Sequence, residues 1–180
     1  MRARKPRRRW LLSLALIGAP LSWLAGCGPT RNQFAPPCPG QAILGDAADF
    51  EAYRGTGHEL VDLVVRGRII GMQGSCREGG KKTELAVTVS IGVAVERGPA
   101  MQGRETDVPL FLAVTAGETI LDKRVYRMHV VFPSNVDSVT LSPGEATLTL
   151  PVSPSKSGAV YTILGGFQLP PDQLVRNPQR

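Results

Sequence analysis

Residues 84–97 read ELAVTVSIGVAVER, the clearest alternating pattern in the chain. Every second residue from Leu85 to Val95 is apolar, and mostly polar or small residues alternate with them. Such an alternation predicts a β-strand in an antiparallel sheet that has one buried face and one face in water. A helix is disfavoured because most of these apolar residues are β-branched, and β-branched side chains prefer the pleated sheet.

Several other segments also predict strands, and the turns between them are rich in glycine and proline. Val108–Ala116 is apolar on both faces, which indicates a central strand covered on both sides. Gly67 is expected at a bulge, and Glu78–Lys81 at a hairpin turn. The other expected strands are Gln41–Leu44, a strand beginning near Leu60 with Val61, Leu63, Val65 and Ile69 on its buried face, Thr119–Phe132, Ala146–Val152 and Ala159–Leu169.

Two segments predict short helices. Asp46–Tyr53 is expected to form a small helix with Asp46 as its N-cap, and Asp172–Val175 a single helical turn. Together with about seven strands joined by short turns, this pattern predicts an all-β fold. We expect an antiparallel β-sandwich of immunoglobulin-like type with one or two short helices, and a small closed β-barrel is the alternative.

The first 26 residues have the pattern of an export signal. Six of the first ten residues are Arg or Lys, and an apolar run from Trp10 to Leu24 follows. This run is shorter than the ~20 residues that a membrane-spanning helix needs, and it has the length of a secretory signal. The run ends in Leu24-Ala25-Gly26-Cys27, where two small residues precede the cysteine.

These four residues resemble the lipobox of bacterial lipoproteins. The resemblance implies cleavage between Gly26 and Cys27 and attachment of a diacylglyceryl group to the Cys27 thiol; stable anchoring needs two or more acyl chains. Gly28, rather than Asp, follows the cysteine, which by the same resemblance implies a periplasm-facing position on the outer membrane, with the inner membrane as the alternative. A plain signal peptide with a chance cysteine and an uncleaved anchor are the other interpretations. The arginines at residues 7–9 leave both Sec and twin-arginine export open.

The chain is therefore expected to have three parts: a signal peptide over residues 1–26, a lipidated tether over residues 27–40, and a single β-sandwich domain over residues 41–180. With Cys27 assigned to lipid, Cys38 and Cys76 remain, and outside the inner membrane such a pair is expected to form a disulfide. The bond would close a loop of about 38 residues and contribute roughly 4 kcal/mol in the chain-entropy model. Two unpaired thiols are the alternative, and a metal site is disfavoured because neither cysteine has a CxxC spacing or a nearby histidine.

The charge of the whole chain is misleading about its partners. The net charge is +6, but six of the 21 cations lie in the first 26 residues, and the remaining 15 cations balance 15 acids. A neutral mature chain gains little from counterion release on a phosphate backbone, and no basic patch is interleaved with aromatic residues. Nucleic acid is therefore excluded as a partner.

The sequence contains no recognisable catalytic motif, and we expect no enzymatic activity, no cofactor and no metal. A hydrolase G-x-S-x-G motif is absent. His58 and His129 are 71 residues apart, and each is expected to be a surface or partly packed imidazole. Lys123, Arg124 and Arg127 are interpreted as a solvated strand face, and a contact for an acidic partner or for lipid headgroups is the alternative.

Further segments of the mature part are similar to uncharacterised small envelope lipoproteins. They are Gly74–Cys76, Glu96–Pro99, Gly165–Leu169 and Gln173-Leu174. The similarity implies one compact domain and no site residues. The first hypothesis is a lipid-anchored, non-enzymatic binding or scaffold module whose envelope protein partner docks on an edge strand or on the loop Arg97–Asp107. The second is a periplasm-facing protein that binds a small ligand or is hydrolytic, with a site assembled from distant residues.

Overall fold

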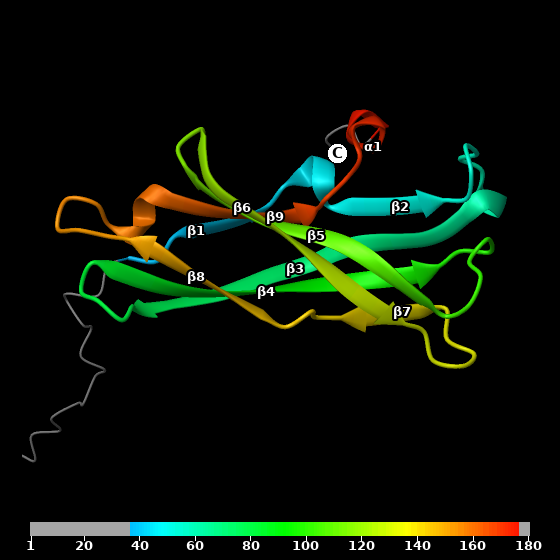
Figure 1. Ribbon diagram of the computed structural model, residues 1–180, viewed down its shortest axis with the longest axis horizontal. Coiled ribbons are helices and arrows are strands. Elements are labelled where there is room, and N and C mark those ends of the chain that lie inside the picture. Colours follow the sequence, from blue (N-terminus) through cyan, green and yellow to red (C-terminus); the bar gives the residue numbers. More distant parts are fainter. Residues whose placement is uncertain (1–36, 177–180) are drawn as a thin grey trace, which may run out of the picture. The chain divides into compact units, whose positions relative to one another are not determined.

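The computed structural model describes residues 37–176, which fold into two packed β-sheets (Figure 1). The expected signal peptide, its cleavage site at Gly26 and the lipidation site Cys27 lie outside the described residues. Sheet A has the strand order β1-β9-β5-β6. Its strands are β1 (Gly40–Ile43), β5 (Glu105–Ala116), β6 (Thr119–Val131) and β9 (Tyr161–Phe167).

Sheet B has the order β2-β3-β4, and two short strands share the far side of β4. Its strands are β2 (Asp49–Tyr53), β3 (Leu63–Glu78), β4 (Glu84–Arg97), β7 (Ser138–Leu141) and β8 (Glu145–Pro151). All pairings in the two sheets are antiparallel except that of β1 with β9. The expected all-β sandwich is confirmed, and the sheets do not close into the alternative barrel.

Strand β4 has the two faces that its sequence predicts. Its six alternating apolar residues from Leu85 to Val95 are all at most 5% exposed and form one wall of the core. Strand β3 precedes it in a hairpin, where the Gly79 amide donates a hydrogen bond to the Glu84 carbonyl at 2.8 Å. Strand β5 is central in sheet A, as expected, because β6 and β9 flank it and Val108 and Leu110–Val114 are buried.

The prediction of a small helix at Asp46–Tyr53 is wrong. A 3₁₀ turn at Gly45–Ala47 (η1) has Leu44, not Asp46, at its N-cap, and β2 follows it. Tertiary pairing overrides the local helix signal here. Phe50 on β2 stacks on Phe167 of β9 with ring centroids 5.6 Å apart, and the Asp49 carboxylate accepts a hydrogen bond from Arg68 at 2.7 Å. This contact raises the pKa of Arg68.

The beginning of β3 also differs from the sequence prediction. Leu60–Asp62 forms a second 3₁₀ turn (η2), and Val61 is 74% exposed rather than part of the buried face. The bulge lies between Ile69 and Gly71, not at Gly67. A glycine is needed at position 67 because the Phe167 ring packs directly on the backbone there. A Cβ atom on Gly67 would lie 3.0 Å from that ring.

The C-terminal part of the described chain is held to the sandwich by polar contacts. A third 3₁₀ turn, Gly158–Val160 (η3), leads into β9, and the helical turn expected near the end is present as α1 (Pro171–Arg176). The buried Gln173 side chain donates a hydrogen bond to the Glu51 carbonyl at 3.1 Å. Within residues 37–176, no helix has the length and apolar character needed to cross a bilayer.

Candidate binding cleft

The sandwich has a long free edge at β6. This strand of 13 residues pairs with β5 on one side, and no strand of residues 37–176 pairs with its other side. Its core-facing residues, including Met128 and Val130, are buried, whereas the seven residues from Thr119 to Val125 are all exposed. An unpaired edge presents backbone donors and acceptors that another strand can use.

The sheet opposite this edge is interrupted. Strand β8 pairs with β4 from Glu84 to Ser90, and β7 pairs with it from Val93 to Glu96. Among the described strands, none pairs with Ile91 and Gly92 on that side. The connecting residues 142–144 cross this gap, and Gly144 takes a φ of 101°, which favours glycine. A contact of 2.8 Å between the hydroxyl oxygens of Ser90 and Ser142 fastens the connection to β4.

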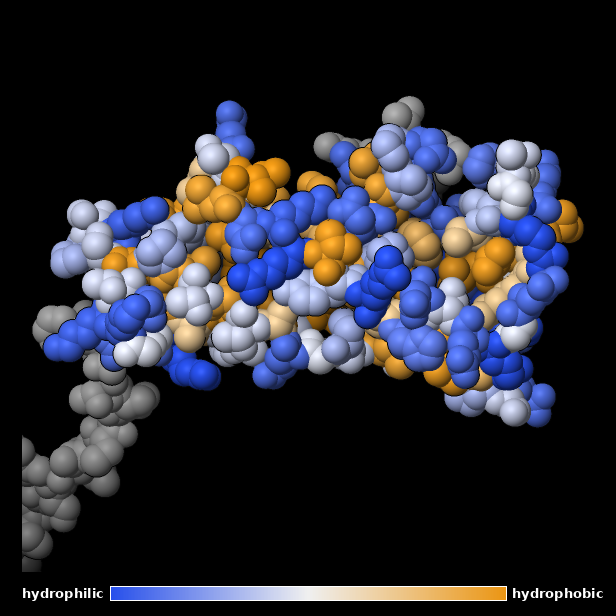
Figure 2. Space-filling view, viewed as in Figure 1, coloured by the Kyte–Doolittle hydropathy of each residue, from blue (hydrophilic) through white to orange (hydrophobic). Residues whose placement is uncertain are grey.

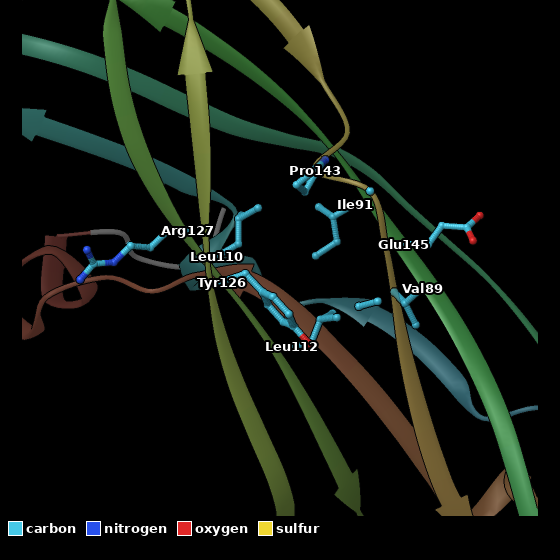
Figure 3. Close-up of a pocket in the computed structure, with 10 residues that line it drawn as sticks. Val89, Ile91, Leu110, Leu112, Tyr126, Arg127, Pro143 and Glu145 are labelled. Carbon is cyan, nitrogen blue, oxygen red and sulfur yellow. The ribbon is translucent and has the colours of Figure 1, made fainter.

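An apolar cleft of about 180 Å³ opens between the free edge of β6 and this interruption. Its interior is formed by core side chains of the two sheets, and its rim by β6 and by the β7–β8 connection (Figure 3). The lining residues are Val89, Ile91, Leu110, Leu112, Tyr126, Arg127, Pro143, Gly144, Glu145 and Ala146.

The orientation of the rim side chains makes the cleft apolar inside and charged outside. Figure 3 shows Tyr126 pointing into the cleft toward Leu112, whereas Arg127 and Glu145 point away from it on opposite sides. Tyr126 therefore brings a hydroxyl group to the apolar cleft. A cavity of about 150 Å³ with apolar walls can hold a benzene-sized group, so a cleft of this size suits a single apolar side chain.

The outer face of β6 carries exposed charge contacts, as the sequence predicted for a solvated strand face. His129 lies 2.9 Å from an Asp107 carboxylate oxygen and 3.8 Å from Glu105. Arg124 pairs with Asp122 at 3.1 Å, but these two exposed residues lie on the other face of β6, in line with Tyr126. Lys123 lies over the Phe111 ring of β5, 4.6 Å from its centroid. Arg127, at the cleft rim, makes no ion pair within residues 37–176.

The expected disulfide is present. Cys38 and Cys76 are bonded, with their Cα atoms 5.7 Å apart. The bond joins the segment before β1 to the C-terminal end of β3. The other histidine, His58, makes an edge-to-face contact with Tyr53 at 5.1 Å and lies far along the chain from His129. Among the described residues, no three His, Cys, Asp or Glu side chains are grouped so that they could hold a metal ion.

The loop Arg97–Asp107 contributes to the core more than its polar sequence indicates. Ala100 and Met101 are each 6% exposed. The Ala100 amide donates a hydrogen bond to the Leu63 carbonyl at 2.9 Å, and β5 already begins at Glu105. The loop is thus closely packed on β3, and the free edge of β6 offers more accessible backbone to a partner.

Two other depressions, of about 270 and 310 Å³, lie along β3 and β4 on sheet B. They are lined mainly by charged, hydroxyl-bearing and glycine residues, among them Arg66, Glu96, Ser90 and Gly92. The cleft beside β6 differs because the side chains of the core itself form its walls. No protein-family model, curated protein or solved structure matches the chain.

Sequence reasoning missed this cleft. Its lining combines residues of β4, β5, β6 and β8, and the apolar residues of its interior have the pattern of ordinary core residues. The available signal was the Ser142-Pro143-Gly144 segment, because proline followed by glycine is typical of a turn. In the structure the chain does not reverse direction at this segment. Strands β7 and β8 on either side of it both run antiparallel to the same strand, β4.

Proposed function

We propose that this protein is a lipid-anchored, non-enzymatic binding module of the bacterial cell envelope. It holds an extended segment of a partner protein along the free edge of β6, and an apolar side chain of that segment enters the neighbouring cleft. The observation that carries the proposal is the position of the apolar cleft directly beside a long unpaired edge.

The proposed location rests on two features of the chain. Residues 24–27 match a lipobox, and Gly28 after the cysteine favours the periplasm-facing outer membrane over the inner membrane. The Cys38–Cys76 bond is of a kind that persists in oxidising compartments outside the cytosol. Lipid attached to Cys27 is thus the proposed link to the membrane.

The proposed mode of binding follows from how free strand edges recognise peptides. An added strand gains main-chain hydrogen bonds from the edge, and pockets for alternate side chains supply specificity. Tyr126 and Arg127 place one such pocket at the middle of β6. Because Arg127 and Glu145 point away from the interior, the pocket selects an apolar side chain, and the two charges flank the bound segment.

A small-ligand site is the second candidate function. The Tyr126 hydroxyl at the mouth of an apolar cleft favours a small, mainly apolar molecule with one polar group. The cleft of about 180 Å³ is smaller than the ~300–1,000 Å³ of most ligand sites. This difference favours the side chain of a protein partner.

Photo-cross-linking in intact cells tests the proposal. A photoreactive residue at Arg127 is expected to trap a partner, whereas one at Thr147, an exposed residue on β8, is not. The substitution Ala146→Leu fills the cleft without changing β6 and is expected to abolish the Arg127 adduct. Equal adducts from both positions, or an Arg127 adduct that survives Ala146→Leu, would contradict this mode of binding.

A further inference from the structure

The end of the sandwich where β1 begins is also the end that bears the β5–β6 hairpin. In sheet A, Gly40 pairs with Thr162, Thr162 with Thr115, and Thr115 with Ile120. Gly40 and Ile120 therefore lie in one row, about 14 Å apart at the usual strand spacing. Cys76 is bonded to Cys38 at this same end. We call residues 76–85, 115–125 and 151–161 the tether end.

The β5–β6 hairpin at the tether end exposes large apolar side chains. Ile120 is 63% exposed, Leu121 51% and Val125 54%. Leu121 is the extra residue of a bulge opposite the bond between Val114 and Thr115, and bulges redirect side chains. Figure 2 shows apolar side chains gathered over this hairpin, below a hydrophilic tip. The flank of the hairpin is thus apolar, whereas its turn carries Glu118.

The charges of the sandwich are distributed unequally between its two ends. The tether end has six cations and four acids. The opposite end, residues 45–62, 97–107 and 129–138, has three cations and eight acids. Arg77 and Lys82 at the tether end make no ion pair within the described part of the chain. A mature chain that is neutral overall therefore presents its positive end on the side where β1 begins.

The tether end is also within reach of a membrane that holds Cys27. Pro37, the first described residue, comes ten residues after Cys27, and ten residues span at most about 35 Å. Anionic lipid surfaces attract Lys and Arg side chains, and exposed apolar side chains bind among the headgroups when they reach them. The exposed flank and the positive charge of the tether end fit such a surface.

We propose that the flank of the β5–β6 hairpin, Ile120 and Leu121, docks on the surface of the bilayer that anchors Cys27, with the cations of the tether end against anionic headgroups. This second contact rests on the lipid anchorage in the proposed function. It fixes the orientation of the domain, so that the acidic end faces away from the bilayer.

The composition of the chain provides a direct test. Both tryptophans, Trp10 and Trp23, precede Cys27, so the mature chain carries none and accepts a single reporter. Leu121→Trp places it on the hairpin, and Val61→Trp is the matched control at the opposite end, where Val61 is 74% exposed. Each lipidated variant is reconstituted into protein-free vesicles of equal parts phosphatidylcholine and phosphatidylglycerol, and its fluorescence is compared with that in vesicles with brominated acyl chains.

We expect the L121W emission to shift to shorter wavelength and to be quenched by the brominated chains, while the V61W emission remains that of a residue in water. Flotation of the vesicles reports separately on the anchor. Protein that floats with L121W emission equal to that of V61W would overturn the docking alone. Protein that does not float would overturn the anchor and the docking together.

Discussion

Filling the cleft beside β6 with a larger side chain should stabilise the fold. Ala146 lies on the cleft wall and packs against the core from β8. Ala146→Leu adds three carbon atoms, and at ~0.8 kcal/mol for each buried methylene the gain is at most about 2.4 kcal/mol. Ordering the leucine costs about 0.5–1 kcal/mol. Because the cleft is open to solvent on one side, we expect a net gain of about 1 kcal/mol.

Urea unfolding of the oxidised protein measures this gain. The free energy of unfolding of Ala146→Leu should rise while the dependence on urea concentration stays unchanged, since the surface exposed on unfolding hardly changes. Ala159→Leu is the matched control, because Ala159 is exposed in η3 and lines no cleft. Its effect should stay within about 0.5 kcal/mol.

A loss of stability in Ala146→Leu would refute the reasoning. Adding methylenes to a closed, well-packed core costs about 1–3 kcal/mol, so a destabilisation of that size would mean that the space beside Ala146 is already filled. An unchanged stability, equal to that of the Ala159→Leu control, would mean that the leucine lies in water and that the cleft is not a pocket.

Three further predictions concern the fold. Replacing both Cys38 and Cys76 by alanine should lower the free energy of unfolding by about 4 kcal/mol for a 38-residue separation, measured in urea against the oxidised protein; a loss below 1 kcal/mol would contradict the chain-entropy account. Gly67→Ala should destabilise by about 1–3 kcal/mol because its methyl group presses on Phe167, and an unchanged urea midpoint would argue against that close contact. Tyr161→Phe removes a 2.6 Å hydrogen bond to a β8 carbonyl and should cost about 1 kcal/mol by the same assay, whereas a neutral effect would mean that the buried hydroxyl contributes nothing.

The alternating strands could be predicted from sequence because one physical rule governs them. In β4 and in the C-terminal half of β6, every second side chain must be buried, and the chain shows this directly in its residue types. The central position of β5 could also be predicted from the sequence, since both faces of this strand are covered and both are apolar.

The errors lie where distant contacts decide the structure. Asp46–Tyr53 has the composition of a helix start, but Phe50 reaches Phe167 and Asp49 reaches Arg68 only if this segment becomes a strand. Gly67 was assigned to a bulge because a glycine inside a strand is ambiguous from sequence. The real bulge at residues 69–71 follows from the register of β3 and β4, which no local pattern encodes.

The cleft could not be predicted because it is a property of the sheet edges. Whether β6 is an edge depends on the strand order, and the gap at Ile91 and Gly92 exists because two short strands share one neighbour. Lipidation at Cys27, in contrast, is predicted by a short local motif and does not depend on strand order. The lipidation of Cys27 remains a prediction.

The intact mass of the membrane-extracted protein tests the central claim most directly, because both proposals depend on a lipid at Cys27. The protein is weighed without reduction, before and after treatment with an alkylating agent under denaturing conditions. We predict a mass equal to residues 27–180 plus acyl chains, unchanged by alkylation because Cys38 and Cys76 are bonded. A mass that retains residues 1–26, or one without lipid, would contradict the account.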